Sequence, residues 1–207
     1  MPEAISGSAC KRADLLAINE WGIDSLELME NASQSVCRYL REHLPGKKLL
    51  VLCGTGNNGA DGLCIARIMK ARAIVAGNLE KGSWEFHHQL AQALKNGIEI
   101  EFYHGQPLGD YEVLVDAVFG IGLKRNVEGQ FRELLEKADE KFSYRVAVDV
   151  PSGINADTGE VMGCAVRADV TITFGRNKTG LVNNKLAGKV IVEDIGIPEE
   201  VYEKAGR

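Results

Sequence analysis

The sequence lacks the features that mark several common protein classes. It has no basic tract: the densest cationic spots are Lys47–Lys48 and Lys124–Arg125, and the net charge is −5. A nucleic-acid groove needs more positive surface than this, so we expect no nucleic-acid partner. No apolar run approaches the length of a membrane span, and the N-terminal residues lack the apolar core of a signal peptide. We therefore expect a cytoplasmic protein without a membrane partner.

Cysteine and proline are also scarce. The five cysteines, at positions 10, 37, 53, 64 and 164, form no CxxC pair. This excludes zinc-finger spacing and favours reduced thiols in a cytoplasmic protein. The chain has only 5 prolines, and 45% of its 207 residues are hydrophobic, with no linker, repeat or low-complexity segment. We expect one globular domain over residues 1–207.

Two helices are predicted at the start of the chain. The first covers residues 11–21. Before the second, Asp24 with Glu27 three residues later forms a capping-box pattern, and apolar side chains then recur at helical spacing to about His43. From residue 48 onward, strand patterns alternate with helical ones. Strands are expected at 48–53, 73–76, 99–102, 113–118, 145–148, 169–174 and 189–193, and helices at 60–71, 84–96 and 130–138.

This alternation predicts an α/β fold: a doubly wound, Rossmann-like α/β/α sandwich around a mostly parallel sheet. No helical pattern lies between the strands at 169–174 and 189–193. Because parallel neighbours are usually joined by a crossover helix, we expect a non-parallel edge at this end of the sheet.

Polar sequences follow three of the predicted strands. The first strand ends in "GTGNNGADG" (54–62), the second carries Asp116 near its end, and Asp149 and Ser152 lie just past the end of the third. In doubly wound folds, ligands bind outside the carboxyl ends of the strands. The sequence therefore predicts that these side chains gather at one edge of the sheet and form one site.

The glycine turn has the GxGxxG spacing of a dinucleotide-binding loop, with glycines at 54, 56 and 59. The amide groups at the start of the following helix favour an anion such as a phosphate. An ordinary NAD site also requires an acid at the end of the next strand, where this chain has Gly77 and Asn78. Asn57, Asn58 and Asp61 are either turn and cap residues or ligand-binding residues, and their shared position on the predicted edge favours the second alternative.

Two acids are candidates for chemistry. Asp116 lies within an apolar strand pattern, so its charge needs a partner. A cation, a substrate hydroxyl or a structural hydrogen bond would each serve. Asp149 is followed by Pro151, which stiffens the turn and would hold the carboxylate rigidly as a general acid or base. The alternative for Asp149 is a brace within the turn. Ser152 either ligates a cation or caps the turn.

The sequence resembles the YjeF N-terminal domain family of NAD(P)H-hydrate epimerases. The resemblance is carried by "GIDSLELMENAS", "GTGNNGADG", "DAVFGIGLKRNVEG", "DVPSGINADTGEV", "TFGRNKTGL" and "GKVIVEDIGIP", in the order and rough spacing of that family, over about residues 15–198. It implies an isomerase that interconverts the R and S epimers of hydrated NADH and NADPH at nicotinamide C6. It also implies a homodimer and an NAD(P)H-hydrate dehydratase as pathway partner. The chain is expected to be either a standalone epimerase or the N-terminal part of a longer protein.

The resemblance also assigns residues to roles. It implies a potassium ion held by Asn58, Asp116 and Ser152, and oxygen ligands suit such a hard cation. Asp149 is the proposed proton shuttle and a substrate contact, with Lys178 as the reserve candidate. The implied substrate-binding residues are Asn57, Asn58, Gly59, Ala60, Asp61, Gly120, Ile121, Gly122, Leu123, Lys124, Arg125, Asn126 and Asp149.

The sequence departs from the family pattern at three positions. Glycines are usual where Ser33 and Ala60 stand, and Ile121 replaces a commoner threonine. Ala60 would restrict the backbone if a positive φ were needed there. The alternatives to an epimerase are a non-catalytic nucleotide-binding or scaffold module of the same fold and an ordinary NAD-dependent oxidoreductase. The intact polar edge argues against the first, and the missing ribose-binding acid argues against the second.

Overall fold

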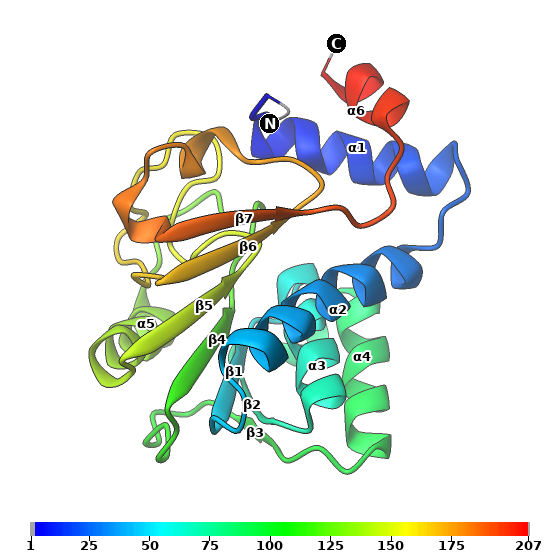
Figure 1. The fold of residues 1–207 in the computed structure, drawn as a ribbon. Helices are drawn as coiled ribbons and strands as arrows, with labels where there is room; N and C mark the ends of the chain where they lie inside the picture. The colour runs from blue at the N-terminus through cyan, green and yellow to red at the C-terminus, as the bar shows by residue number, and fades with distance from the viewer. Residues whose placement is uncertain (1–2, 207) are drawn as a thin grey trace.

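A computed structural model describes residues 3–206. Its centre is a seven-stranded sheet in the order β3-β2-β1-β4-β5-β6-β7, in which every neighbouring pair is parallel. The strands are β1 (Leu49–Cys53), β2 (Arg72–Val75), β3 (Ile100–Phe102), β4 (Val113–Ala117), β5 (Tyr144–Val148), β6 (Val170–Phe174) and β7 (Lys189–Glu193). The predicted Rossmann-like α/β architecture is confirmed (Figure 1).

Helices cover both faces of the sheet. They are α1 (Gly7–Asn19), α2 (Ser25–His43), α3 (Asn57–Met69), α4 (Trp84–Lys95), α5 (Gly129–Lys141) and α6 (Glu199–Ala205), with short 3₁₀ turns η1 (Leu79–Lys81), η2 (Thr179–Leu181) and η3 (Lys185–Ala187). Helices α2, α3 and α4 lie on one face and α5 on the other (Figure 1). Within residues 3–206, no helix is both long and apolar enough to cross a membrane.

Alternation along the strands divides the core between these two faces. In β1, Leu49, Val51 and Cys53 pack with α2, α3 and α4, whereas Leu50 and Leu52 pack with α5. Successive side chains of a strand point to opposite faces, so a strand buried on both sides has a continuous apolar sequence. This explains why the apolar runs predicted the central strands well.

The predicted non-parallel edge is wrong, because β6 and β7 pair in parallel, with Val170 opposite Lys189. The connection over residues 175–188 contains η2 and η3 instead of a helix. Leu181 and Ala187 of this connection pack with Val150 and Ile154 from the segment between β5 and β6. An irregular crossover that buries its own apolar side chains therefore replaces the expected crossover helix.

The first and last helices pack together, although the sequence analysis predicted no helix at α6. Ala13 and Ala17 of α1 share an apolar cluster with Val201, Tyr202 and Ala205 of α6. The Arg12 guanidinium donates two hydrogen bonds, of 2.9 and 2.7 Å, to the carbonyl oxygen of Ala205. In Figure 1 the two helices lie above β7. Their packing determines which face of α1 is turned toward the strands.

Candidate functional site

A cavity of about 830 Å³ lies at the carboxyl ends of the strands. Its wall combines residues far apart in the sequence: Cys10, Asp14 and Ile18 of α1, the start of α3, the segment after β4, Asp149 after β5, and Lys178 and Tyr202 from the C-terminal part. A dinucleotide-sized ligand fits a volume in this range. The cavity lies where ligands bind in doubly wound folds, as the strand pattern predicted.

The glycine turn brings the start of α3 to the cavity. Helix α3 begins at Asn57, three residues earlier than predicted, so Asn57, Asn58 and Asp61 belong to its first turns. A Cβ on Gly59 would lie 1.8 Å from the carbonyl oxygen of Gly54, and a Cβ on Gly54 would lie 2.2 Å from that of Val118. Glycine is therefore required for this close packing of the turn. Ala60 has no positive φ and lies inside the helix, so the anticipated backbone restriction does not arise.

Asp116 and Ser152 form a buried hydrogen-bonded pair behind the cavity wall. Ser152 donates to Asp116 through its backbone N–H at 2.7 Å and through Oγ at 2.5 Å, and both residues are fully buried. The N–H of Phe119, a cavity residue, donates to the same Oγ at 2.8 Å. Burial raises the pKa of Asp116 to about 6, although hydrogen bonds from Ser152 and Val118 act in the opposite direction. The structural hydrogen bond left open by the sequence is present.

Asn58 lies against Gly120, the residue after Phe119, with an unsatisfied side chain. Both its Oδ1 and Nδ2 are buried without a hydrogen-bond partner, and a Cβ on Gly120 would lie 3.2 Å from its Cγ. A buried amide without a partner is costly, so these two atoms are available to bind a ligand. In the part of the chain that the structure describes, no cluster of three or more His, Cys, Asp or Glu could hold a metal ion. The donors here are instead amide, hydroxyl and carboxylate oxygens, which suit a hard cation.

Asp149 and Lys178 form a second polar pair, in which Lys178 is buried and the Asp149 side chain is 13% exposed. The Lys178 Nζ lies 2.5 Å from Asp149 Oδ1 and donates to the carbonyl oxygen of Phe174 at 2.9 Å. Thr173 Oγ1 donates to the same carboxylate at 3.2 Å. Burial alone would lower the pKa of Lys178, but the neighbouring carboxylates hold it above its usual value. Asp149 has a φ of 66°, in the left-handed region.

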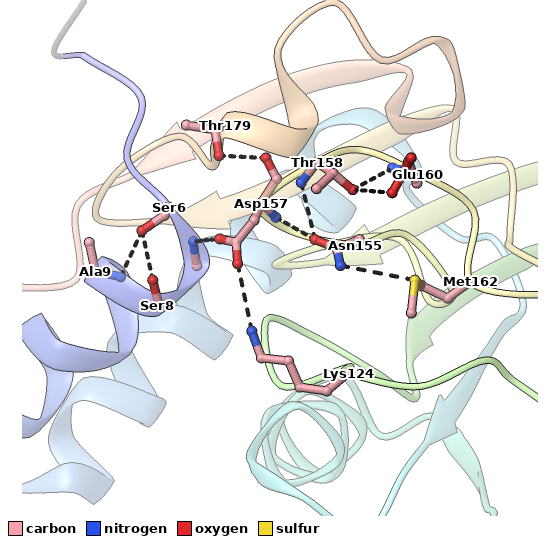
Figure 2. A network of polar contacts seen from close by, with 11 residues as sticks. Ser6, Ser8, Ala9, Lys124, Asn155, Asp157, Thr158, Glu160, Met162 and Thr179 are labelled. Atoms are coloured by element: carbon pink, nitrogen blue, oxygen red, sulfur yellow. Dashed lines mark hydrogen bonds and ion pairs between the residues drawn. The ribbon is translucent and has the colours of Figure 1, made fainter.

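The segment after β4 closes another side of the cavity. Residues 120–125 line it, but Asn126 does not. The Lys124 ammonium lies 3.6 Å from an oxygen of Asp157, whose other carboxylate oxygen accepts a 2.6 Å hydrogen bond from the backbone N–H of Gly7. Figure 2 shows Asp157 between the start of α1 and Lys124. One carboxylate thus holds both the segment and the N-terminus of α1 in place.

The structure brings most of the predicted site residues together. Those that line the cavity are Asn57, Asn58, Asp61, Gly120, Ile121, Gly122, Leu123, Lys124, Arg125 and Asp149. Gly59 and Ala60 are buried in the packing of α3, and Asp116 and Ser152 lie behind the wall. Their roles in binding and catalysis stay predictions.

Several cavity residues were missed from the sequence, including Cys10, Asp14, Glu85 and Tyr202. Asp14 is the most notable of these, because burial raises its pKa to about 7. A single acid on an amphipathic helix gives no signal in the sequence, since its position over the cavity depends on the packing of α1 against α6.

The fold and the cavity define an α/β protein of the doubly wound class with its ligand site at the strand ends. Residues 25–180 match the family model described as YjeF-related protein N-terminus. The chain belongs to this family. A crystal structure of the yeast protein ynu0, YNL200c, has the same fold, with a TM-score of 0.83 at 21% identity over 100% of this chain and 94% of that one.

Curated relatives match almost the whole chain. A protein of Limosilactobacillus fermentum named NAD(P)H-hydrate epimerase is 42% identical over 93% of this chain and 96% of its own length. One of Oenococcus oeni with the same name is 38% identical, with 94% and 97% covered. A third, the bifunctional NAD(P)H-hydrate repair enzyme Nnr of Dictyoglomus turgidum, is 34% identical over 95% of this chain and only 41% of its own length.

Proposed function

We propose that this chain is an NAD(P)H-hydrate epimerase, an isomerase that interconverts the R and S epimers of hydrated NADH and NADPH. The observation that carries the proposal is the cavity at the strand ends, with its pair of Asp149 and Lys178. Relatives of nearly equal length carry the same name. A non-catalytic module would not need to keep an acid–base pair in an open cavity.

The start of α3 is the proposed contact for the dinucleotide phosphates. The N-cap residue Gly56 has no side chain, and no side-chain hydrogen bond caps the helix. Its first N–H groups and the positive end of the helix dipole are therefore available to an anion. Lys124 and Arg125, which also line the cavity, add positive charge. We place the nicotinamide end of the substrate toward Asp149.

The reaction inverts C6, the carbon that carries the hydroxyl beside the ring nitrogen. If an acid protonates this hydroxyl, the nitrogen lone pair expels it as water and leaves a planar iminium, and water can then add to either face. Ring opening and reclosure would also invert the centre. Both routes move a proton near C6, and such general acid–base catalysis contributes roughly 10²–10⁴ in rate. We assign this proton transfer to Asp149, with its carboxylate held in place by Lys178 and Thr173.

We propose that Asn58, Asp116 and Ser152 are ligands of a potassium ion. The fit rests on the buried Asn58 amide, which has no partner and packs on Gly120, and on the oxygen donors of Asp116 and Ser152, which bond each other and the N–H of Phe119. When bound, the ion would offset the charge of Asp116 and of the substrate phosphates. The segment after β4 is held in place at two residues. The Phe119 N–H donates to Ser152 Oγ, and Gly120 packs against Asn58 of α3.

The remaining expectations concern the surroundings of the enzyme. We propose a cytoplasmic homodimer that works with an NAD(P)H-hydrate dehydratase, and the bifunctional relative, which is longer than this chain, supports a repair partner. Light scattering of the purified protein would test the dimer: a monomer mass at micromolar concentration would contradict it.

A coupled assay tests the function itself. A mixture of both hydrate epimers is incubated with a dehydratase specific for the S epimer, with and without this protein. The dehydratase alone consumes only the S half, whereas the added epimerase lets the whole mixture be consumed. A protein that binds NADPH but leaves the R half intact would be a binding module. A protein that oxidises NADPH in this assay would be an oxidoreductase.

A further inference from the structure

Helix α1 turns one acid toward the cavity. Cys10, Asp14 and Ile18 follow one another at four-residue spacing, which places them on one face of the helix, and all three line the cavity. Another face of α1, which carries Ala13 and Ala17, packs against α6. The packing of α1 against α6 therefore orients the face that carries Asp14 toward the cavity.

The Asp14 carboxylate has no fixed partner there. Among residues 3–206, no hydrogen bond or ion pair to its oxygens is present, although Asp149 on the same cavity has both Lys178 and Thr173. Charged and titratable groups face it from every element packed around it: Cys10 and Lys11 of α1, Asp61 of α3, Asp149 after β5, Lys178 before η2 and Tyr202 of α6. Three carboxylates thus share one buried ammonium, which is already bound to Asp149.

Asp149 and Asp14 differ in their partners. Lys178 keeps the charge of Asp149 compensated at 2.5 Å, whereas burial and the charge of Asp149 favour the neutral form of Asp14, with a pKa of about 7. The pKa of Asp61 is also raised, well above its usual value. Two acids of one site that differ in their partners are suited to opposite roles in proton transfer.

We propose that Asp14 is a second proton-transfer residue of this site, and that it provides the proton that Asp149, paired with Lys178, does not. The inference rests on the proposed function. An inversion needs a proton for the leaving hydroxyl and an acceptor for the proton of the incoming water, so two proton-handling groups suit it better than one. Asp14 comes from α1 and Asp149 from the end of β5.

The step balances without any further reactant. The Asp14 carboxylic acid gives its proton to the C6 hydroxyl, the C6–O bond breaks, and water leaves with that electron pair. The nitrogen lone pair forms the C=N bond of the iminium. A water molecule then bonds to C6 on the other face and gives a proton to Asp149, while the C=N pair returns to nitrogen. Exchange with solvent restores the proton to Asp14, and the reverse reaction uses the two acids in exchanged roles.

The test compares Asp14→Asn and Asp14→Glu with Glu20→Gln in the coupled assay. Glu20 lies at the end of the same helix, where it pairs with Lys204 on the surface, so the control removes the same charge outside the cavity. For Asp14→Asn we expect kcat to fall at least about 100-fold with KM changed less than about threefold. Asp14→Glu restores part of the rate, because it restores a carboxylic acid.

The pH profile separates a proton-transfer role from a structural one. In the wild type, the step that needs protonated Asp14 slows as pH rises through about 7, and this descending limb of kcat disappears in Asp14→Asn. Fluorescence titration with NADPH, used as a probe of the cavity, is expected to give similar affinities for both proteins.

Three outcomes are distinguishable. If the wild type does not consume the R epimer, the proposed function itself fails. If the wild type is active and Asp14→Asn keeps both its kcat and its pH limb, like Glu20→Gln, only the present inference is overturned. If Asp14→Asn is unfolded, Asp14→Glu decides: a folded variant with wild-type kcat and an unshifted limb overturns the inference, and a lowered kcat with a shifted limb supports it.

Discussion

The charged side chains at the amino ends of the strands differ from those at the carboxyl ends in their pairing and exposure. Near the amino ends of the strands, Lys47 pairs with Glu112 at 2.6 Å, and Arg72 pairs with Glu99 at 3.3 Å. All four residues keep access to solvent. At the carboxyl ends, the carboxylates of Asp14, Asp61, Asp116 and Asp149 lie in or behind one cavity with one buried ammonium. One end has ion pairs open to solvent, and the other gathers four carboxylates, of which Asp116 is fully buried, in or behind a cavity with one buried ammonium.

This difference separates what the fold requires from what chemistry requires. Exposed ion pairs contribute little to stability and are easily replaced. Buried carboxylates that share one cation lower the stability of the fold, and titratable groups with shifted pKa values gather at functional sites. Packing therefore does not explain why these carboxylates gather around one buried ammonium at the carboxyl ends, and their gathering agrees with a site that handles protons and cations.

The largest effect is expected for Asp149→Asn. The substitution removes the group assigned to proton transfer and leaves Lys178 with a neutral partner. The rate of epimerisation should fall by roughly 10²–10⁴, while NADPH still binds. Steady-state kinetics and a fluorescence titration measure the two quantities. A variant that keeps more than about a tenth of the rate would remove Asp149 from the mechanism.

A smaller effect is expected from Asp14 on stability. Its folded pKa of about 7 lies above the unfolded value, so the folded state binds the extra proton. The stability that this proton adds is fully present below about pH 4 and is lost as pH rises through 7. The rise from 3.8 to about 7 corresponds, at about 1.4 kcal/mol per pKa unit, to on the order of 4 kcal/mol. The free energy of unfolding of Asp14→Asn should therefore exceed that of the wild type at pH 8 by up to about this amount, with little difference at pH 4. Urea denaturation at both pH values measures this, and a variant less stable at pH 8 would contradict it.

The prediction of a bound cation concerns Asn58, and the expected change in stability is smaller. If potassium binds the folded protein, a concentration ten times its Kd should stabilise it by about 1.4 kcal/mol. Thermal unfolding in KCl against LiCl at equal ionic strength measures this. The difference should vanish in Asn58→Ala and persist in Asn57→Ala, whose side chain lies on the same helix turn. Equal melting curves of the wild type in both salts would exclude a specific ion.

The smallest effect is expected at the amino ends of the strands. Lys47→Ala breaks the pair with Glu112, and both side chains are about half exposed. Epimerase activity should be unchanged and Tm should stay within about 2 °C of the wild type. A clear loss of activity would show that charge at this end also serves the site, and the contrast between the two ends would then fail.

The sequence predicted most of the fold because local patterns determine most of it. The capping box at Asp24 gave α2, which ends at His43 as expected, and apolar runs gave β1 and β4 within a residue. The direction of β7 was missed because an irregular crossover has no periodic pattern. The start of α3 was missed because a glycine-rich first turn looks like a loop.

The site was predictable to the extent that its residues follow strands. The sequence placed Asn58, Asp116, Asp149 and Ser152 at one edge of the sheet, and the structure brings them to one cavity and its wall. The contribution of α1 was not predictable, since it depends on a distant contact with α6. The pairing of Asp149 with Lys178 joins residues 29 positions apart that no spacing rule connects.

The left-handed backbone at Asp149 limits which experiments on this residue can be interpreted. At a φ of 66°, asparagine and aspartate are tolerated far better than other residues with side chains. Replacement by alanine or glutamate would twist the turn as well as change the acid, so a lost rate would have two causes. Asparagine keeps both the chain path and the size of the side chain while deleting the charge. An amino-acid scan at this position would otherwise measure conformational preference more than chemistry.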